Sequence, residues 1–398
     1  MGLNWWVKDF LSPRKKGRVR VKNKNDSLLQ INLMIAMKRT FALTVCYLLA
    51  SWAIAGTVTP ATGIPAYYKD VDGKTGKALF DQIHVIAKVG YHSLGYDGLW
   101  NAYKETDVRA DGTIWDMYSD CDFRLGTGKC GNYKKECDCY NREHSIPKSW
   151  FGDTKSGPGC DIFHLVPTDG KVNGMRSNYP FGEISNASYT SGNGSKLGSS
   201  KNISVTGKTI VGNKGVSASC SDKVFEPVDE YKGDFARAYF GTMIKWADDY
   251  QAFTSSNGST IFSGNYTASG YFGLTKYGVA LLLKWHREDP VSQKEIDRNN
   301  GIQKTQGNRN PFIDYPYLAE YIWGEHAGEA VNLDKLVHSE DIRFIPDESN
   351  GYDNTPSSIE EITVDEDVTA IKILRDGQLL ILHQGKLYNV CGQPVAVE

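Results

Sequence analysis

The amino-acid sequence predicts an α+β protein, with one large mixed helix-and-strand domain followed by a small all-β module. Apolar residues recur at helical spacing in several segments, which indicates amphipathic helices. Other short runs alternate apolar and polar residues between turn residues, as strands do. The chain has 398 residues, of which 40% are hydrophobic and 12% aromatic, so it can bury a substantial core.

The first predicted helix follows Thr75, a residue type that caps helix N-termini. Leu79, Ile83 and Ile86 would share its buried face, and Gly90 would end it. Residues 113–118 alternate like a strand.

Three further helices are predicted in the second half of the chain. Asp234 can cap the first of them, and its core-facing stripe consists of Phe235, Tyr239, Met243 and Trp246. Residues 276–285 form the next helix, and residues 317–323 the last, which ends at Gly324. Residues 185–215 are rich in Gly, Ser, Thr and Asn, which indicates loops or short edge strands.

The N-terminus differs from the rest of the chain. Residues 1–36 carry eight Lys or Arg against two Asp, and residues 37–55 have the form of a secretory signal peptide, with a basic start, an apolar middle and small residues at the end. A start codon assigned too far upstream would account for the basic extension. The alternative is a basic cytoplasmic tail before a membrane anchor, but the apolar stretch is short for a span of about 20 residues.

The C-terminus forms a separate unit. Residues 346–368 are acidic and polar, as an extended linker would be. Residues 369–398 predict three short strands with turns at 376–377 and 384–385. This module resembles the C-terminal sorting modules of proteins exported through a bacterial outer membrane. The alternative is a small β addition that packs on the large domain.

Cysteine usage agrees with export. Cys46 lies in the signal segment and Cys391 near the end, and six others remain: Cys121, Cys130, Cys137, Cys139, Cys160 and Cys220. An even number in an exported chain indicates disulfides, with about 15 pairings that sequence leaves open. A zinc site is the alternative, but two of these cysteines are separated by a single residue, too close for a zinc-finger pair.

A short segment collects the residues that metal-assisted phosphodiester hydrolysis needs. Glu143 and His144 are adjacent, and Asn173 follows 29 residues after His144. A neutral His, with an unperturbed pKa of about 6.5, can take a proton from water near neutral pH. Glu143 and Asn173 offer the hard oxygen ligands that Mg²⁺ accepts, with Mn²⁺ or Ca²⁺ as substitutes. A lone Glu-His pair is usually an ordinary surface pair. The neighbouring motifs therefore decide whether this pair belongs to a catalytic site.

Three ordered motifs carry a family resemblance. They are Glu143-His144, the run from Asp161 to Glu183, and Gln306-Gly-Asn-Arg-Asn-Pro-Phe312. The chain resembles the endonuclease I family of secreted, weakly sequence-selective nucleases over roughly residues 75–325. The resemblance implies a ββα-metal, or His-Me finger, motif, with Asn173 on a helix that Asp169 or Thr168 caps.

This motif would also resolve a difficulty in the sequence. Pro147 disfavours helix around His144, so Glu143 and His144 lie on an extended segment whose neighbouring side chains point to opposite faces. In a His-Me finger, the His and the metal ligands approach the phosphate from different sides.

The predicted chemistry assigns a role to each residue. His144 is the general base that activates water, and Mg²⁺ on Glu143 and Asn173 stabilises charge at the leaving 3′ oxygen, so that the products carry 5′-phosphates. Because the nucleophile is water, DNA and RNA are both expected substrates. Some relatives bring an Arg to the phosphate on an insertion that is short here, which leaves Arg176 and Arg298 as candidates for phosphate contact. His164 is expected to orient a neighbour or to pack.

Charge limits how the substrate is held. Residues 57–339 contain 31 basic and 33 acidic residues, so this part of the chain is nearly neutral. No global basic surface marks a nucleic-acid binder. Phosphate contacts must therefore come from a local cluster and the bound metal.

The sequence thus predicts a secreted, periplasmic or surface-attached Mg²⁺-dependent endonuclease, whose catalytic domain is residues 56–345. It predicts no stable protein partner and no membrane span in the mature form, with the C-terminal module as a contact for export or surface-anchoring machinery. Two alternatives remain. One is a catalytically inactive nucleic-acid-binding or surface adhesion protein, and the other is a phosphodiesterase for small nucleotides, which near-neutral charge also allows.

Overall fold

The computed structural model describes residues 66–152, 155–221, 223–248, 253–332 and 336–342, and three strands between 370 and 389. The predicted basic extension (1–36), signal peptide (37–55) and acidic linker (346–368) lie outside the described residues. Within the described part of the chain, no helix combines the length and apolar character that crossing a membrane requires.

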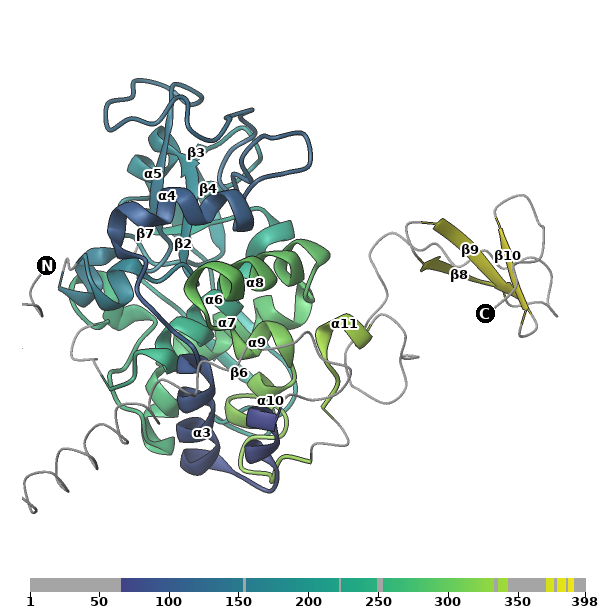
Figure 1. The fold of residues 1–398 in the computed structure, drawn as a ribbon. Helices are drawn as coiled ribbons and strands as arrows, with labels where there is room; N and C mark the ends of the chain where they lie inside the picture. Colours follow the sequence, from purple (N-terminus) through teal and green to yellow (C-terminus); the bar gives the residue numbers. More distant parts are fainter. Residues whose placement is uncertain are drawn as a thin grey trace, which may run out of the picture. The chain divides into compact units, whose positions relative to one another are not determined.

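The core of the large domain is built around one helix, α6 (Lys232–Lys245), which is buried on nearly every side. A helix buried all round belongs in the centre of a domain. Helices α3 (Gly76–Lys88), α7 (Lys276–Glu288) and α9 (Pro311–Asp314) pack against it. Figure 1 shows α6, α7, α8 and α9 gathered in the middle of the domain.

The described residues form further helices. The α-helices are α4 (Gly95–Thr106), α5 (Gly170–Arg176), α8 (Gln293–Gln306), α10 (Leu318–Ile322) and α11 (Ser339–Ile342). The 3₁₀ helices are η1 (Ala66–Val71), η2 (Lys148–Phe151), η3 (Gly157–Cys160), η4 (Asp229–Tyr231), η5 (Ser256–Thr260) and η6 (Ala268–Gly273).

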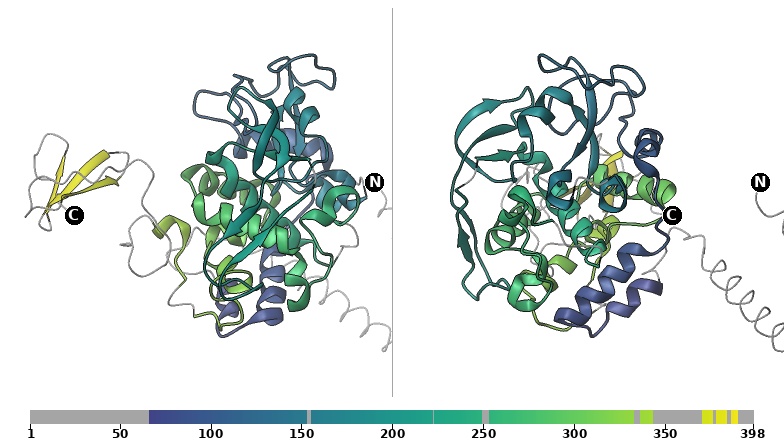
Figure 2. Two further views of the ribbon diagram at one scale, coloured as in Figure 1. Left: turned by 180° about the vertical axis from the view of Figure 1, so that it is seen from behind. Right: turned by 90° about the vertical axis from the view of Figure 1, so that its left-hand side faces the viewer.

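The strands of the large domain form three small antiparallel sheets. They are the pair β1 (Tyr140–His144) and β2 (Leu165–Asp169), the sheet β3 (Ile184–Thr190), β4 (Lys196–Ser200) and β7 (Lys223–Glu226), and the pair β5 (Ile203–Val205) and β6 (Val216–Ala218). Two further views show short teal strands along the outside of the helical group (Figure 2). The segment 185–215 thus contains the short strands that its composition predicts.

The predicted helices are present, but some of them begin or end at other residues than predicted. Helix α3 follows Thr75 as predicted, with Leu79, Ile83 and Ile86 buried, although it ends at Lys88. The cap predicted at Asp234 is wrong, because α6 begins at Lys232 and Asp234 lies inside its first turn. Its carboxylate pairs with Lys294 on α8 instead.

The strand predicted at 113–118 is wrong. Thr113 and Ile114 make only isolated bridges, to Arg124 and Val108, and no strand runs through this segment. The side chain and main chain of Thr113 both bond to the Asp111 carboxylate, a turn that competes with strand pairing.

The ββα arrangement that the family resemblance implies is confirmed. Strand β1 pairs antiparallel with β2 from Tyr140 opposite Asp169 to His144 opposite Leu165, and α5 begins at the next residue, Gly170. Figure 1 shows β2 and α5 close to α4.

Two disulfides hold the loop before β1. Cys121 pairs with Cys137 and Cys130 with Cys139. The expectation that all six cysteines pair is wrong, since Cys160 carries a buried thiol that donates to the Lys155 carbonyl.

The C-terminal module contains the three predicted strands. They are β8 (Ala370–Arg375), β9 (Gln378–His383) and β10 (Lys386–Asn389), paired antiparallel in the order β10-β9-β8. The two predicted turns lie outside the described residues.

Candidate active site

The β1-β2-α5 motif is fixed by the cap of its helix. The Asp169 carboxylate accepts from the Val172 amide at 2.8 Å, as an N-cap does. The same carboxylate accepts from the Cys137 amide at 2.7 Å, so the bridged loop is tied to the start of α5.

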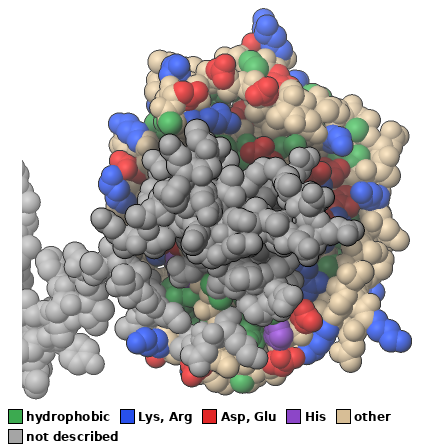
Figure 3. All heavy atoms as spheres, turned by 90° about the vertical axis from the view of Figure 1, so that its right-hand side faces the viewer, with side chains coloured by type: hydrophobic (Ala, Val, Ile, Leu, Met, Phe, Trp, Pro, Cys, Tyr) green, Lys and Arg blue, Asp and Glu red, His purple; other side chains and the backbone are tan. Residues whose placement is uncertain are grey.

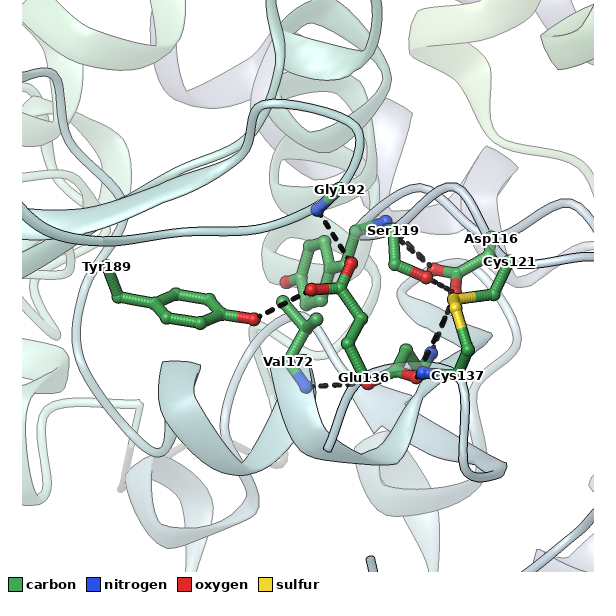
Figure 4. Close-up of a disulfide and its surroundings, with 10 residues drawn as sticks. Asp116, Ser119, Cys121, Glu136, Cys137, Val172, Tyr189 and Gly192 are labelled. Atoms are coloured by element: carbon green, nitrogen blue, oxygen red, sulfur yellow. Dashed lines mark hydrogen bonds between the residues drawn. A yellow bond between two sulfur atoms is a disulfide. The ribbon is translucent and has the colours of Figure 1, made fainter. Parts of the chain in front are cut away.

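Figure 4 shows how the bridged loop is anchored on its other side. Glu136 precedes Cys137 and accepts from the Gly192 amide at 2.7 Å and from the Tyr189 hydroxyl at 3.1 Å. Glu136 and Cys137 therefore connect the start of α5 to β3 and the turn that follows it, and the disulfide ties Cys121 to this segment.

Glu143 lies on the face of β1 that looks toward α5. It is only 3% exposed, and its Oε1 accepts from Arg176 and from the Tyr118 hydroxyl, each at 3.0 Å. Burial raises the pKa of Glu143 to about 7, although the Arg176 charge and the Tyr118 bond oppose that rise. Both side-chain bonds use Oε1, and the His144 amide also donates to this carboxylate.

Asn173 joins the same face from α5. Its Nδ2 donates to Asn141 Oδ1 at 2.7 Å, and Asn141 precedes Glu143 by two residues on β1, so both strand residues point to one side. The Asn173 side-chain oxygen is not used in that bond.

The donor set on this face fits Mg²⁺. A carboxylate oxygen and an amide oxygen meet the preference of Mg²⁺ for a few hard protein ligands, with its other positions left to water and substrate. A deeply buried carboxylate with a raised pKa is also a group that a cation would stabilise in its ionised form. The described residues contain no cluster of three or more His, Cys, Asp or Glu suited to a metal, so any metal here depends on this mixed pair.

His144 lies on the opposite face of β1. Its ring stacks on Tyr96, with centroids 5.8 Å apart and 17° between the planes. Its Nε2 lies 3.2 Å from the Gly159 carbonyl oxygen, which only accepts, so Nε2 carries the proton and Nδ1 carries the lone pair. Burial lowers the pKa of His144 well below its usual value, so the ring is neutral at neutral pH.

His164 supports the segment that orients the His144 ring. The Ile146 amide donates to its Nδ1 at 3.4 Å, and its Nε2 lies 2.8 Å from the Pro158 carbonyl. Since Pro158 precedes Gly159, His164 holds the turn whose carbonyl orients His144. This is the orienting or packing role predicted for it.

Arg176 and Arg298 do not lie where the sequence prediction expects them. Arg176 has no exposed surface and donates to Glu143 and to the carbonyls of His144 and Ser145. Arg298 is 6% exposed and donates to Asp107 and to carbonyls at the start of β2. Both guanidinium groups are committed inside the protein, and phosphate contact does not fit this placement.

Several contributors were not predicted from the sequence. Tyr118 and the Gly159 carbonyl carry no motif that announces a role. Asn141 did carry a signal, because it stands two residues before Glu143 and therefore shares its strand face.

The third family motif buttresses the site. The Gln306 amide donates to Asp161, and its oxygen accepts from the Ile162 amide at 3.0 Å. Asn310 caps α9 and donates to the Arg237 carbonyl of α6 at 2.9 Å. The Gln306 bonds fix the approach to β2, and the Asn310 bond joins the start of α9 to α6.

Comparison with known proteins decides the family. The family model described as Endonuclease I matches residues 75–317, more than half of the chain. The chain belongs to the endonuclease I family. Members of this family hydrolyse nucleic acid, so this chain is an enzyme of that class.

Individual relatives of this endonuclease I family member agree with the match. The extracellular ribonuclease of Bacillus amyloliquefaciens is 33% identical over 283 residues, which cover 68% of this chain and 82% of the relative. The extracellular ribonuclease of Bacillus subtilis (strain 168) is 33% identical over 279 residues, which cover 68% of this chain and 83% of the relative. Endonuclease-1 of Buchnera aphidicola is 25% identical over 205 residues, which cover 46% of this chain and 66% of the relative.

Proposed function

We propose that this protein is a secreted, Mg²⁺-dependent endonuclease that hydrolyses phosphodiester bonds in DNA and RNA with little sequence preference. The observation that carries the proposal is the division of β1 into two faces. One face holds a carboxylate and, through Asn141, an amide oxygen donor, and the other holds a neutral imidazole whose Nδ1 has a lone pair.

In this mechanism His144 is the general base. The Gly159 carbonyl holds the Nε2 proton, so Nδ1 accepts a proton from the attacking water. The stack on Tyr96 keeps the imidazole plane in place. Because its pKa is low, His144 is already neutral at neutral pH and needs no prior loss of a proton.

Glu143 and Asn173 are the residues that would hold Mg²⁺. When bound there, Mg²⁺ supplies electrostatic stabilisation of the charge that develops on the phosphate and on the leaving 3′ oxygen. Arg176 keeps the Glu143 carboxylate oriented and partly compensates its charge. Departure of the 3′ oxygen leaves the phosphate on the 5′ end of the product.

The proposed substrate range and location rest on chemistry and on the relatives. Attack by water needs no ribose 2′-OH, and the relatives are named as ribonucleases and as an endonuclease. The two Bacillus relatives are named extracellular, and the two disulfides suit an oxidising compartment. The C-terminal strands are proposed to serve export or surface attachment.

The test compares the wild type with His144→Ala, Glu143→Ala and Asn173→Ala on supercoiled plasmid and single-stranded RNA, with Mg²⁺ or with EDTA. We expect nicking and RNA cleavage that EDTA abolishes and that each substitution lowers by about a hundredfold or more. Mn²⁺ and Ca²⁺ in place of Mg²⁺ measure which ion supports the reaction.

Circular dichroism of each variant separates lost chemistry from lost folding. If the folded wild type leaves both polymers intact but still retards them in a gel, the binding-protein alternative replaces the nuclease. If it cleaves only a small phosphodiester such as bis(p-nitrophenyl) phosphate, the small-nucleotide phosphodiesterase takes its place.

A further inference from the structure

A groove runs beside strand β1, between the strand and helix α4. It has a volume of about 380 Å³ and is lined by Tyr96, Trp100, Lys129, Cys130, Gly131, Asn141 and Arg142. Its walls therefore combine two aromatic rings with two cations and an amide.

The rings and cations of the groove form one continuous stack. The Arg142 guanidinium lies 3.5 Å from the centre of the Tyr96 ring and 4.7 Å from that of Trp100. The Lys129 ammonium lies 4.7 Å from the centre of the Trp100 ring. Arg142 also donates to the Tyr96 carbonyl and lies 3.3 Å from the exposed Asp97 carboxylate, so its position is fixed.

The groove is continuous with both halves of the proposed site. The Tyr96 ring contacts the Arg142 guanidinium and also stacks on the His144 ring. Asn141 lines the groove and accepts the bond from Asn173. A nucleotide in the groove would therefore lie beside Tyr96, which contacts the proposed general base, and Asn141, which contacts the proposed metal ligand Asn173.

Two properties indicate what the groove binds. Aromatic and guanidinium faces stack on nucleobases that have left a duplex, whereas paired bases hide their faces in the helix. The domain is nearly neutral overall, and Figure 3 shows Lys and Arg side chains lying among Asp and Glu on the visible part of one face. A local cluster of cations beside aromatic rings is thus where a phosphate and its base would be held together.

We propose that this groove is a subsite for an unpaired nucleotide, which stacks its base on Trp100 in place of the Lys129 ammonium and pairs its phosphate with Lys129. The inference rests on the proposed nuclease function and adds a preference for single-stranded substrate. Lys129 is exposed and its four-carbon side chain is flexible, so its ammonium can move from the ring to a phosphate. Base stacking is stronger than the exposed cation–π contact that it replaces.

The test measures binding without hydrolysis. The full-length His144→Ala protein is titrated in EDTA against a fluorescent oligothymidylate and against a duplex of the same length, and anisotropy gives each Kd. Adding Trp100→Leu is expected to weaken single-strand binding roughly fivefold or more, whereas Trp100→Phe, which keeps a stacking face, restores most of it. Lys129→Ala is expected to weaken binding and to lower its salt dependence. The exposed Lys77→Ala on α3 is the matched control.

Cleavage by the same substitutions in the active protein distinguishes this inference from the proposed function. We expect kcat/KM for single strands to fall several-fold more than kcat/KM for duplex, with a rise in KM and little loss of kcat. If the wild type nicks plasmid but Trp100→Leu and Lys129→Ala bind oligothymidylate as the parent does, the subsite is overturned and the nuclease stands. Equal losses on single strand and duplex also overturn it. If nothing is cleaved but the Trp100 effect on binding persists, the proposed function fails and the subsite stands.

Discussion

The buried pair of Arg176 and Glu143 replaces the phosphate contact that the sequence suggested. Arg176 lies three residues after Asn173 on α5, but its guanidinium turns inward to a carboxylate. Helical spacing gives the direction of a side chain only approximately. The final orientation of the guanidinium depends on the nearest buried charge. Desolvated charges of opposite sign are strongly favoured to pair.

Replacing Arg176 leaves Glu143 buried without its partner. Arg176→Met is expected to lower the free energy of unfolding by about 3–5 kcal/mol at pH 8. The folded pKa of Glu143 is already raised to about 7, and losing the Arg raises it further, so protonation relieves the cost as pH falls. The loss should therefore be smaller at pH 5.5. Urea unfolding at both pH values checks this.

The double variant Arg176→Met with Glu143→Gln is the control, and it should recover part of the loss at pH 8. An equal loss at the two pH values would instead assign the effect to the bonds that Arg176 makes to the His144 and Ser145 carbonyls.

His164 predicts an acid-sensitive fold. Burial lowers its pKa from about 6.5 to about 4, so the unfolded chain takes up a proton that the folded chain resists. Stability is therefore lost as pH falls from about 6.5 toward 4. Between pH 7.5 and pH 5 this group should remove about 2 kcal/mol from the free energy of unfolding. His164→Asn, which cannot titrate, should reduce that pH dependence by a similar amount.

Urea unfolding of both proteins at the two pH values measures the difference. His84→Asn is a comparison at a partly buried His of α3 that contacts the Ile244 carbonyl and Asp248. If His164→Asn shows the same loss with pH as the wild type, another buried group carries the acid sensitivity.

At the scale of elements, apolar periodicity predicted where helices lie, but it did not predict the residues at which they begin and end. The stripe of Phe235, Tyr239, Met243 and Trp246 located α6, because these residues face the core whichever residue begins the helix. The predicted cap at Asp234 was wrong, because α6 begins at Lys232 and Lys294, sixty residues away in sequence, pairs with the Asp234 carboxylate. Helices α4 and α8 were not predicted, because their sequences mix polar and apolar residues with several glycines and asparagines.

The Cys121–Cys137 bridge should matter more for the site than the Cys130–Cys139 bridge. Its removal by Cys121→Ser with Cys137→Ser is expected to cost about 3 kcal/mol, since the bridged residues are 16 apart. The second bridge spans 9 residues and should contribute less. The first variant should also lose several-fold in kcat/KM at a temperature where it is still folded, because the Cys137 amide positions Asp169.

Thermal unfolding and plasmid nicking measure both effects, with Cys130→Ser and Cys139→Ser as the matched control. Equal losses of activity in the two double variants would show that the loop acts only through general stability.

At the scale of the molecule, the family motifs predicted the ββα core and placed Asn173 on a helix capped by Asp169 or Thr168, and the structure shows this helix as α5, capped by Asp169. What sequence could not supply was everything brought in by tertiary packing: Tyr118 behind Glu143, Gly159 behind His144, and the inward turn of Arg176 and Arg298. Those partners come from segments whose separation along the chain has no periodic or motif signal.

Near-neutral charge predicts weak salt dependence of substrate binding. The proposed groove offers Lys129 and Arg142 to phosphates, and Arg142 is shared with Asp97. For a single strand, log K should fall with log salt with a slope of about −1, or about −1.5 at most. Anisotropy titrations of the His144→Ala protein in EDTA at several salt concentrations measure it. A slope steeper than about −4 would mean that a larger basic surface binds the strand.

The opposite faces of β1 also constrain how this gene can change in length. Glu143 and His144 depend on a register of five residue pairs with β2. Inserting or deleting one residue within β1 would turn the carboxylate toward Tyr96 and the imidazole toward α5, which exchanges the two halves of the site. Residues 147–156 carry no such constraint on their number, because they lie outside the strand pair and before the segment 158–164 that orients His144. Natural length variation in this enzyme is therefore expected between the two strands, and almost never within the first.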